Sequence, residues 1–204
     1  MRLLSLVWLL AIFSLSVEGK ETPAAVIYGK PISYQAITPN SEELEEMGLV
    51  RQMPKYRFYL AQVRTGRLIK TLLDEATAKF ASERGIEKGK DKALIESVIN
   101  TFYPEEETIS EEQQMNAEEI VYRWQIDKAL YEEFGGTVVF QQSNPVAPIE
   151  SYRLLLQREL NGGALELVDE QLATMVWESM GPPYRLVVEP ENVKFDTPWW
   201  QSTQ

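Results

Sequence analysis

The sequence predicts a mainly α fold, in which a single domain of four or five helices with two or three short strands follows a signal peptide. Three observations lead to this prediction. Apolar residues recur at helical spacing in several long segments, and Gly or Pro stands where most of these segments end. Runs rich in β-branched residues are few and short. The chain has 204 residues and no Cys, so its fold depends on a buried core instead of disulfides.

The first 19 residues are typical of a secretory signal peptide. Arg2 provides a positive start, an apolar run of about fifteen residues follows, and Val17 and Gly19 suit the two cleavage-site positions that need small side chains. The alternative is an uncleaved membrane anchor, but a helix needs about 20 apolar residues to cross a bilayer. We therefore predict a cleaved segment 1–19, a periplasmic or secreted protein and no stable membrane span.

The N-terminal part of the mature chain predicts a β-hairpin and a short helix. Residues 25–33 hold two short apolar stretches around a Gly-Lys turn, and Gly adopts the positive φ that a tight hairpin needs. Ser33 is suited to cap a following helix, which Pro39 interrupts. Asn40 or Ser41 precedes residues 42–47, which predict a short acidic helix whose Glu side chains lie in the first turns, where the helix dipole favours them.

Two further helices are predicted next. The first covers residues 55–84, the longest segment with helical apolar spacing, and Gly85 is placed to end it in a left-handed conformation. The second begins at Asp91 and stops at Pro104. Basic side chains in the first half of the long helix are interpreted as a solvated face or as partners of the chain's own carboxylates; they are Arg57, Arg64, Arg67 and Lys70.

Residues 105–119 are interpreted as a solvated connector, because they carry seven Glu and no Lys or Arg. A calcium-binding EF-hand is not expected there, since its loop needs Asp or Asn at fixed steps and a central Gly. Asn116 and Glu119 have the spacing of a capping box, which places the start of the next helix at this point. That helix is predicted to end at Gly135.

The C-terminal part predicts two strands and two helices. Residues 137–142 are β-branched and aromatic and form a short strand, after which Asn144 marks a turn. Helical spacing covers residues 149–160, and Asp169 caps a last helix. Residues 184–189 are predicted as a closing strand.

Composition excludes most catalytic and metal chemistry. Without His or Cys there is no Ser-His-Asp triad, no Cys-His pair and no zinc site with nitrogen or sulfur ligands. We predict no catalytic residue, no metal site and no cofactor. The net charge of −11 disfavours nucleic acid, because binding to phosphate needs Lys and Arg. Adjacent carboxylates leave a carboxylate-dependent hydrolase as an alternative; the pairs are Glu118-Glu119, Glu132-Glu133 and Asp169-Glu170.

Aromatic side chains exceed what a small helical core needs, and rings with a polar edge are favoured where one protein binds another. Residues 199–204 form an aromatic C-terminal tail, whose Trp199-Trp200 pair either folds back into a groove of its own chain or stays available to a partner. A groove between the long helix and the helix with Trp124 is predicted to accept extended apolar segments. The side chains predicted to bind them are Tyr59, Val63, Leu68, Trp124, Tyr131 and Trp199.

Three stretches carry a family resemblance: Val26-Ile27-Tyr28-Gly29-Lys30-Pro31-Ile32-Ser33, then Leu68-Ile69-Lys70-Thr71-Leu72-Leu73, then Lys79-Phe80-Ala81. Over residues 24–100 the chain resembles the N-terminal domain of SurA-type periplasmic chaperones, which starts with a short strand, an Asn-Gly-x-x-Ile-Thr-like turn and helices. Tyr28 stands where that family usually has Asn, and Pro39 interrupts the helix that normally follows the turn.

The resemblance implies that residues 20–198 form a helical SurA-N-like domain, which holds or guides unfolded exported polypeptides. No stretch is expected to form a parvulin domain, so prolyl isomerisation is not implied. We therefore predict a chaperone-like module that binds unfolded or exported polypeptides; its oligomeric state does not follow from the sequence. One alternative is a structural subunit of a larger envelope complex, with the aromatic tail as its contact. The other is the hydrolase, which needs two carboxyls that converge in one pocket.

Overall fold

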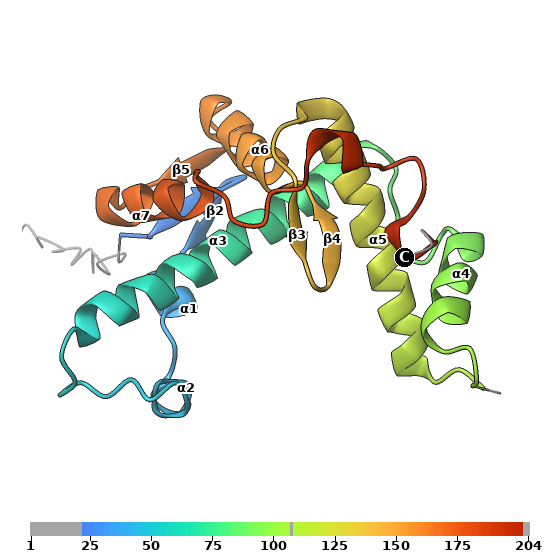
Figure 1. Cartoon of the computed structure of the whole chain (residues 1–204). Helices are drawn as coiled ribbons and strands as arrows, with labels where there is room; N and C mark the ends of the chain where they lie inside the picture. The colour runs from blue at the N-terminus through green and yellow to red at the C-terminus, as the bar shows by residue number, and fades with distance from the viewer. Residues whose placement is uncertain (1–21, 107, 202–204) are drawn as a thin grey trace, which may run out of the picture.

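The computed structural model describes residues 22–106 and 108–201, so the predicted signal peptide 1–19 lies outside the described residues. The mainly α prediction is confirmed, although the elements are more numerous than predicted, and together they form an arch (Figure 1). None of the described helices is long and apolar enough to cross a bilayer.

The α-helices are α1 (Tyr34–Ile37), α2 (Ser41–Glu46), α3 (Tyr56–Glu83), α4 (Lys92–Phe102), α5 (Glu111–Phe134), α6 (Ile149–Asn161) and α7 (Glu170–Met180). The strands are β1 (Ala25–Ile27), β2 (Lys30–Ile32), β3 (Val139–Gln141), β4 (Asn144–Ala147) and β5 (Leu165–Leu167), and two 3-10 helices follow, η1 (Pro190–Asn192) and η2 (Trp199–Gln201).

A small antiparallel sheet joins the N-terminal hairpin to the C-terminal helices. The predicted hairpin is present: β1 pairs with β2, and Tyr28 (φ 49°) and Gly29 (φ 76°) both take the positive φ of a tight turn. Strand β5, which we did not predict, pairs with the other edge of β1, with Ala25 opposite Leu167. This pairing places α6 and α7, which flank β5, beside the N-terminal hairpin.

Helix α3 is the central element of the fold. Its 28 residues span about 42 Å at a rise of ~1.5 Å per residue. Leu68, Leu72, Ala76 and Phe80 recur every fourth residue and are completely buried in one cluster with residues of α6, α7 and the sheet. Gly85 ends the helix region at a φ of 66°, as predicted. We call this cluster the main core.

Four helix starts are capped at the residues that the sequence indicated. Side-chain oxygens of Ser33, Asp91 and Asp169 each accept a hydrogen bond from the amide three residues on. Asn40 and Glu43 form a reciprocal capping box at α2. Each of these contacts joins neighbours in the chain, so the sequence is sufficient to predict it.

Helix α5 starts earlier than predicted. We expected its start at Asn116, but the helix begins at Glu111. The Ser110 hydroxyl accepts a hydrogen bond from the Gln113 amide at 3.2 Å, and the Gln113 side chain accepts one from the Ser110 amide at 2.8 Å. Glu111 and Glu112 in the first turn add a favourable interaction with the helix dipole. The solvated connector is therefore shorter than predicted, because residues 111–119 are helical.

The strands of the C-terminal part were predicted only in part. The strand over residues 137–142 is present as β3, but Asn144 starts β4 instead of marking a turn, and the two strands form a hairpin. The segment 184–189, predicted as a strand, contacts β3 through a β-bridge at Val187 and is irregular. Leu186 in this segment has a φ of 53°, which extended strands do not allow.

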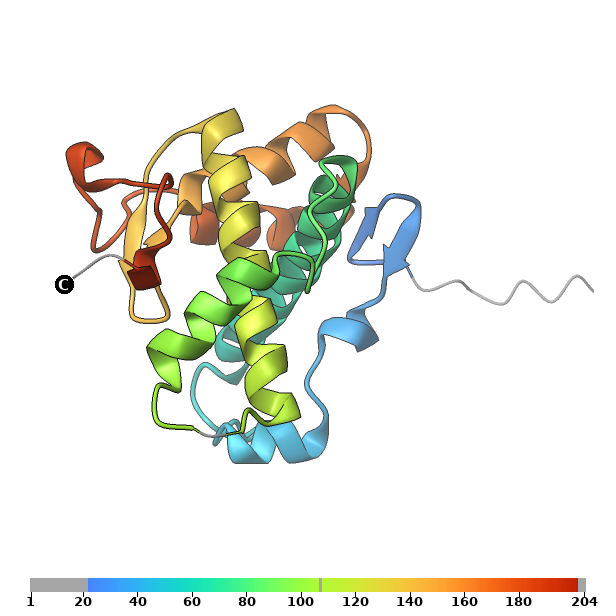
Figure 2. The ribbon, with the colours of Figure 1, turned by 90° about the vertical axis from the view of Figure 1, so that its right-hand side faces the viewer.

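Helix α5 belongs to two hydrophobic clusters. Ile126 and Leu130, in its C-terminal half, are part of the main core. Val121 and Trp124 pack instead against α4 and against Trp200 of η2, in a cluster that we call the α4–α5 cluster. Figure 2 shows α4 lying along the N-terminal half of α5. In that half α5 diverges from α3, and the arch opens between the two helices (Figure 1).

Candidate functional site

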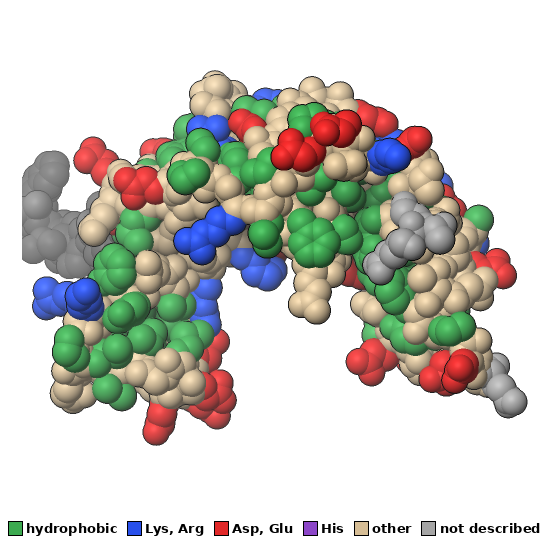
Figure 3. All heavy atoms as spheres, in the orientation of Figure 1, with side chains coloured by type: hydrophobic (Ala, Val, Ile, Leu, Met, Phe, Trp, Pro, Cys, Tyr) green, Lys and Arg blue, Asp and Glu red, His purple; other side chains and the backbone are tan. Residues whose placement is uncertain are grey.

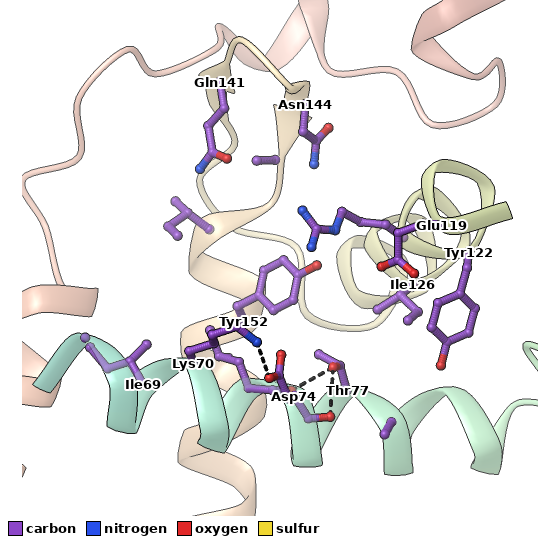
Figure 4. Close-up of a pocket in the computed structure, with 16 residues that line it drawn as sticks. Ile69, Lys70, Asp74, Thr77, Glu119, Tyr122, Ile126, Gln141, Asn144 and Tyr152 are labelled. Carbon is purple, nitrogen blue, oxygen red and sulfur yellow. Dashed lines mark hydrogen bonds and ion pairs between the residues drawn. The ribbon is translucent and has the colours of Figure 1, made fainter. Parts of the chain in front are cut away.

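The angle between α3 and α5 contains the candidate site, a cavity of about 530 Å³ that we call the α3–α5 cleft. Residues between Gly66 and Ala78 of α3 form one side, and residues between Glu119 and Ile126 of α5 form the other. The β3–β4 hairpin and the start of α6 also line it (Figure 4). The volume is in the range of ~300–1,000 Å³ that is typical of ligand sites.

Apolar and aromatic side chains from three helices line the cleft. Ile69 and Leu73 lie one turn apart on α3, and Tyr122 and Ile126 lie one turn apart on α5. Tyr152 of α6 lies between the two helices, in the middle of the cavity (Figure 4). All of these except Ile126 are only partly buried. The cleft is therefore apolar surface that the rest of the fold does not cover.

A buried hydrogen-bond network connects α5, α6 and β4 behind Tyr152. Asp127 is 1% exposed, and its carboxylate accepts hydrogen bonds from Asn144 Nδ2 at 2.7 Å and from the Tyr152 hydroxyl. Burial raises the pKa of Asp127 to about 6, against the opposite effects of these two hydrogen bonds and of the Arg123 charge. Burial, together with the nearby Asp127, also raises the pKa of Tyr152. The network fixes the position of Tyr152 in the cleft.

Most charged side chains at the cleft are paired within the chain. Lys70 Nζ lies 2.5 Å from Asp74 Oδ2, and Glu119 Oε2 lies 2.8 Å from Lys88 Nζ. Arg123 is the remaining charged residue of the lining. The polar rim is therefore largely neutralised, and apolar contacts dominate what the cleft offers to a ligand.

The space-filling view shows the hollowed inner face of the arch, where Lys and Arg side chains gather near the top and along one leg (Figure 3). Asp and Glu side chains lie near the lower ends of both legs. Two predicted basic residues of α3 contact their own chain: Arg67 pairs with Glu43 at 2.7 Å, and Arg64 Nε donates to Thr38 Oγ1 at 2.9 Å. Both contacts attach residues 34–46, the segment that contains α1 and α2, to α3.

Of the six residues predicted to bind polypeptide, none lines the α3–α5 cleft. Tyr59 and Val63 lie near the start of α3, where Tyr59 is exposed and contacts Phe58 edge-on. Leu68 is completely buried in the main core, so it stabilises the fold and offers no surface to a partner. A binding role for Tyr59 and Val63 stays a prediction.

The other three predicted residues are aromatic and lie around α5. Trp124 is buried, and Trp199 packs against Phe102 with 5.9 Å between the ring centroids. Tyr131 packs against Phe195 at a centroid distance of 5.0 Å. The structure brings Trp124 and Trp199 together at one cavity but places Tyr131 elsewhere.

The Trp199-Trp200 pair of the aromatic tail takes the first of its two predicted arrangements and packs onto its own chain, while residues 202–204 lie outside the described residues. Trp200 is 6% exposed and stands edge-on to Trp124, with 5.7 Å between the ring centroids. Its Nε1 donates a hydrogen bond to Ser97 Oγ of α4 at 2.9 Å. Trp200 is therefore part of the α4–α5 cluster, and Trp199 packs against that cluster.

The residues that line the cleft were missed because they lie beside the core positions. Ile69 and Leu73 each follow a buried leucine, Leu68 and Leu72, so the apolar stripe of α3 is wider than one core face requires. This width is a signal in the sequence. It does not show which flank of the stripe a neighbouring helix covers.

The three adjacent carboxylate pairs predicted for a hydrolase take part in contacts within the fold. Glu119 pairs with Lys88, Glu133 with Arg158 at 3.0 Å, and Asp169 caps α7. In the part of the chain that the structure describes, no three acidic side chains converge so that they could hold a metal ion.

Comparison with known proteins finds no match for this chain among protein-family models, curated proteins or solved structures. The likeness to SurA-type domains therefore stays at the level of the sequence motifs. Any account of function depends on the geometry of the α3–α5 cleft and its surroundings.

Proposed function

We propose that this protein is a chaperone-like module that binds extended, apolar segments of unfolded exported polypeptides in the α3–α5 cleft. The observation that carries the proposal is the partly exposed apolar lining, with Ile69, Leu73, Tyr122 and Tyr152 around one concave surface. Burying one large apolar side chain fully against such a surface contributes about 1.5–3 kcal/mol. Several such contacts are enough for reversible binding without a specific sequence.

The length of the cleft supports an extended segment as the ligand. Gly66 and Ala78, at the two ends of its α3 side, are about 18 Å apart at the helical rise of ~1.5 Å per residue. An extended chain covers ~3.3 Å per residue, so about five residues fit along this side. Tyr152 is held by Asp127, so part of the surface is already ordered before a segment binds.

The geometry supports binding better than hydrolysis. Two carboxylates of α5, the desolvated Asp127 and Glu119, line one cavity between α4 and α5, and Glu119 also lines the α3–α5 cleft. Eight residues along α5 correspond to about 12 Å, whereas glycosidase carboxyls lie roughly 5–9.5 Å apart. Asp127 accepts hydrogen bonds on both oxygens, and Glu119 pairs with Lys88.

The alternative of a structural subunit requires the tail as a contact to another protein. In this structure Trp200 is packed against Trp124 and Ser97 of its own chain. A tail in this arrangement supports the alternative less than the open cleft supports polypeptide binding.

The test compares the mature protein with two variants in an assay of client aggregation. Ile69→Glu places a carboxylate in the apolar lining, and Met115→Glu places the same group on an exposed position of α5 outside the cleft. We expect the wild type and Met115→Glu to suppress aggregation of a chemically unfolded client, and Ile69→Glu to lose most of this effect. Circular dichroism checks that both variants are folded.

Two results would contradict the proposal. One is a wild-type protein that leaves aggregation unchanged at stoichiometric excess. The other is equal suppression by Ile69→Glu and Met115→Glu, since the activity would then not depend on the α3–α5 cleft.

A further inference from the structure

Arg123 of α5 lies at the junction of two cavities. It lines the α3–α5 cleft, and it also lines a second cavity of about 560 Å³, which we call the α4–α5 pocket. This pocket lies between the end of α4, α5, the turn of the β3–β4 hairpin and Trp199 of the tail. Arg123 is the positively charged residue that the linings of both cavities share; Glu119, which is paired with Lys88, also lines both, and the hydrogen-bonded Asp127 lines the α4–α5 pocket.

The guanidinium of Arg123 has no partner in the fold. Among the residues that the structure describes, no carboxylate lies within 4.0 Å of it, and its side chain makes no hydrogen bond. Lys70, the other cation of the cleft, is paired with Asp74. Asp127, one turn from Arg123, attracts it electrostatically but uses its oxygens for Asn144 and Tyr152. Five N–H donors are therefore open to a ligand.

The surroundings of Arg123 favour a planar anion attached to an apolar group. Aromatic rings of Phe102, Trp124 and Trp199 line the pocket side, and Ile126 and Tyr152 line the cleft side. A carboxylate matches the fork of a guanidinium and accepts two parallel hydrogen bonds.

We infer that the α3–α5 cleft is selective for apolar segments that carry a carboxylate, and that Arg123 binds this carboxylate. The inference rests on the proposed binding of polypeptide in the same cleft. A polypeptide offers the group from two sources, its C-terminus and its Asp or Glu side chains. Arg123 lies where the cleft adjoins the α4–α5 pocket, since Glu119, Arg123 and Asn144 line both cavities, so a segment in the cleft can place its carboxylate there.

The experiment measures the affinity of three short fluorescein-labelled peptides by fluorescence anisotropy. All three alternate Leu and Ala: one has a free C-terminal carboxylate, one is amidated, and one is amidated with an Asp in place of one Ala. We expect at least one acidic peptide to bind the wild type about tenfold more tightly than the neutral amide, the usual scale of a hydrogen bond to a charged group. The acidic peptide that gains affinity identifies the source of the carboxylate.

Two variants assign the effect to one residue. In Arg123→Gln we expect the acidic peptides to lose about tenfold in affinity while the neutral amide keeps its affinity. Arg51→Gln, which removes a charge from an exposed residue outside both cavities, leaves all three affinities unchanged.

The outcomes separate this inference from the proposed function. Equal affinity of the wild type for all three peptides overturns the selectivity but leaves polypeptide binding intact. A preference for acidic peptides that persists in Arg123→Gln overturns the role of Arg123. Failure of every peptide to bind the wild type contradicts the proposed function, and the inference with it.

Discussion

The main core and the α4–α5 cluster are built differently, although α5 contributes to both. The main core contains 18 buried side chains, which come from the sheet, from Ala24 just before it, and from α1, α3, α5, α6 and α7. The α4–α5 cluster contains six, and one of them, Trp200, comes from the end of the described chain. The main core therefore depends on many elements at once, whereas the smaller cluster depends strongly on a single ring.

The difference explains why the cleft lies where it does. The C-terminal half of α5 is fixed to α3 by the main core, through Ile126 and Leu130. The N-terminal half is held by α4 instead, through Ala117 and Val121, and Trp124, just past the middle of the helix, packs against Trp200 of the tail. The cleft occupies the point where α5 changes from one set of neighbours to the other. Three substitutions probe the two regions and the connection between them, and they are given from the largest expected effect to the smallest.

Phe80→Ala tests the main core. Phe80 is completely buried, packs against Phe134 and lies beneath the guanidinium of Arg84. We expect a loss of about 3–5 kcal/mol in the free energy of unfolding, because the substitution removes a large buried ring and leaves a cavity. Urea denaturation followed by circular dichroism measures the effect. Phe102→Ala is the control, since that ring is 44% exposed, and it is expected to cost no more than about 1 kcal/mol.

Trp200→Ala tests the α4–α5 cluster. We expect a loss of about 3 kcal/mol, limited to the elements that the ring covers, because it removes the contact with Trp124 and the hydrogen bond to Ser97. Amide hydrogen exchange should show faster exchange in α4 and in the N-terminal half of α5, while α3 and α6 keep their protection. A uniform loss of protection across α3 and α6 would show that the two regions unfold as one unit.

Asp127→Asn tests the connection between the two regions and the hairpin. The folded pKa of Asp127 is about 6, above the ordinary value of 3.8, so the folded state holds this proton more tightly than the unfolded state. The stabilising contribution is present below about pH 4 and is lost as the pH rises through about 6. Over this window the wild type should lose up to about 3 kcal/mol relative to the variant.

The measurement for Asp127→Asn is urea denaturation of both proteins at several pH values. Comparison of the two proteins is essential, because the pKa values of Glu43 and Glu150 are lowered, mainly by hydrogen bonds from Arg67 and Thr137, and these groups stabilise the fold at higher pH. A difference in stability that stays constant with pH would contradict the assignment of a raised pKa to Asp127.

The candidate site could be predicted only in outline. A groove between the long helix and the helix with Trp124 was expected, and the α3–α5 cleft lies between these two helices. The residues predicted to line this groove are not the ones that line it. Large aromatic side chains are mostly buried on average in folded proteins, and Trp124 is buried within the fold. Ile69 and Leu73 stay partly exposed because α5 turns away from them.

The sequence by itself determined the elements whose contacts are local. The caps at Asn40, Asp91 and Asp169 each join residues a few positions apart, and the N-terminal hairpin needs only a turn with positive φ at Gly29. The buried stripe of α3 follows from the helical period alone. Such features need no knowledge of distant segments.

The tertiary structure decided which apolar surfaces are covered. The pairing of β5 with β1, the return of Trp200 onto Trp124 and the burial of Asp127 all depend on residues distant in the chain. Each of these contacts orders two separate segments, which costs conformational entropy. The contact forms because the favourable interactions buried between the segments offset this cost. The open cleft is the surface that no such contact covers, so only the folded arrangement shows where it lies.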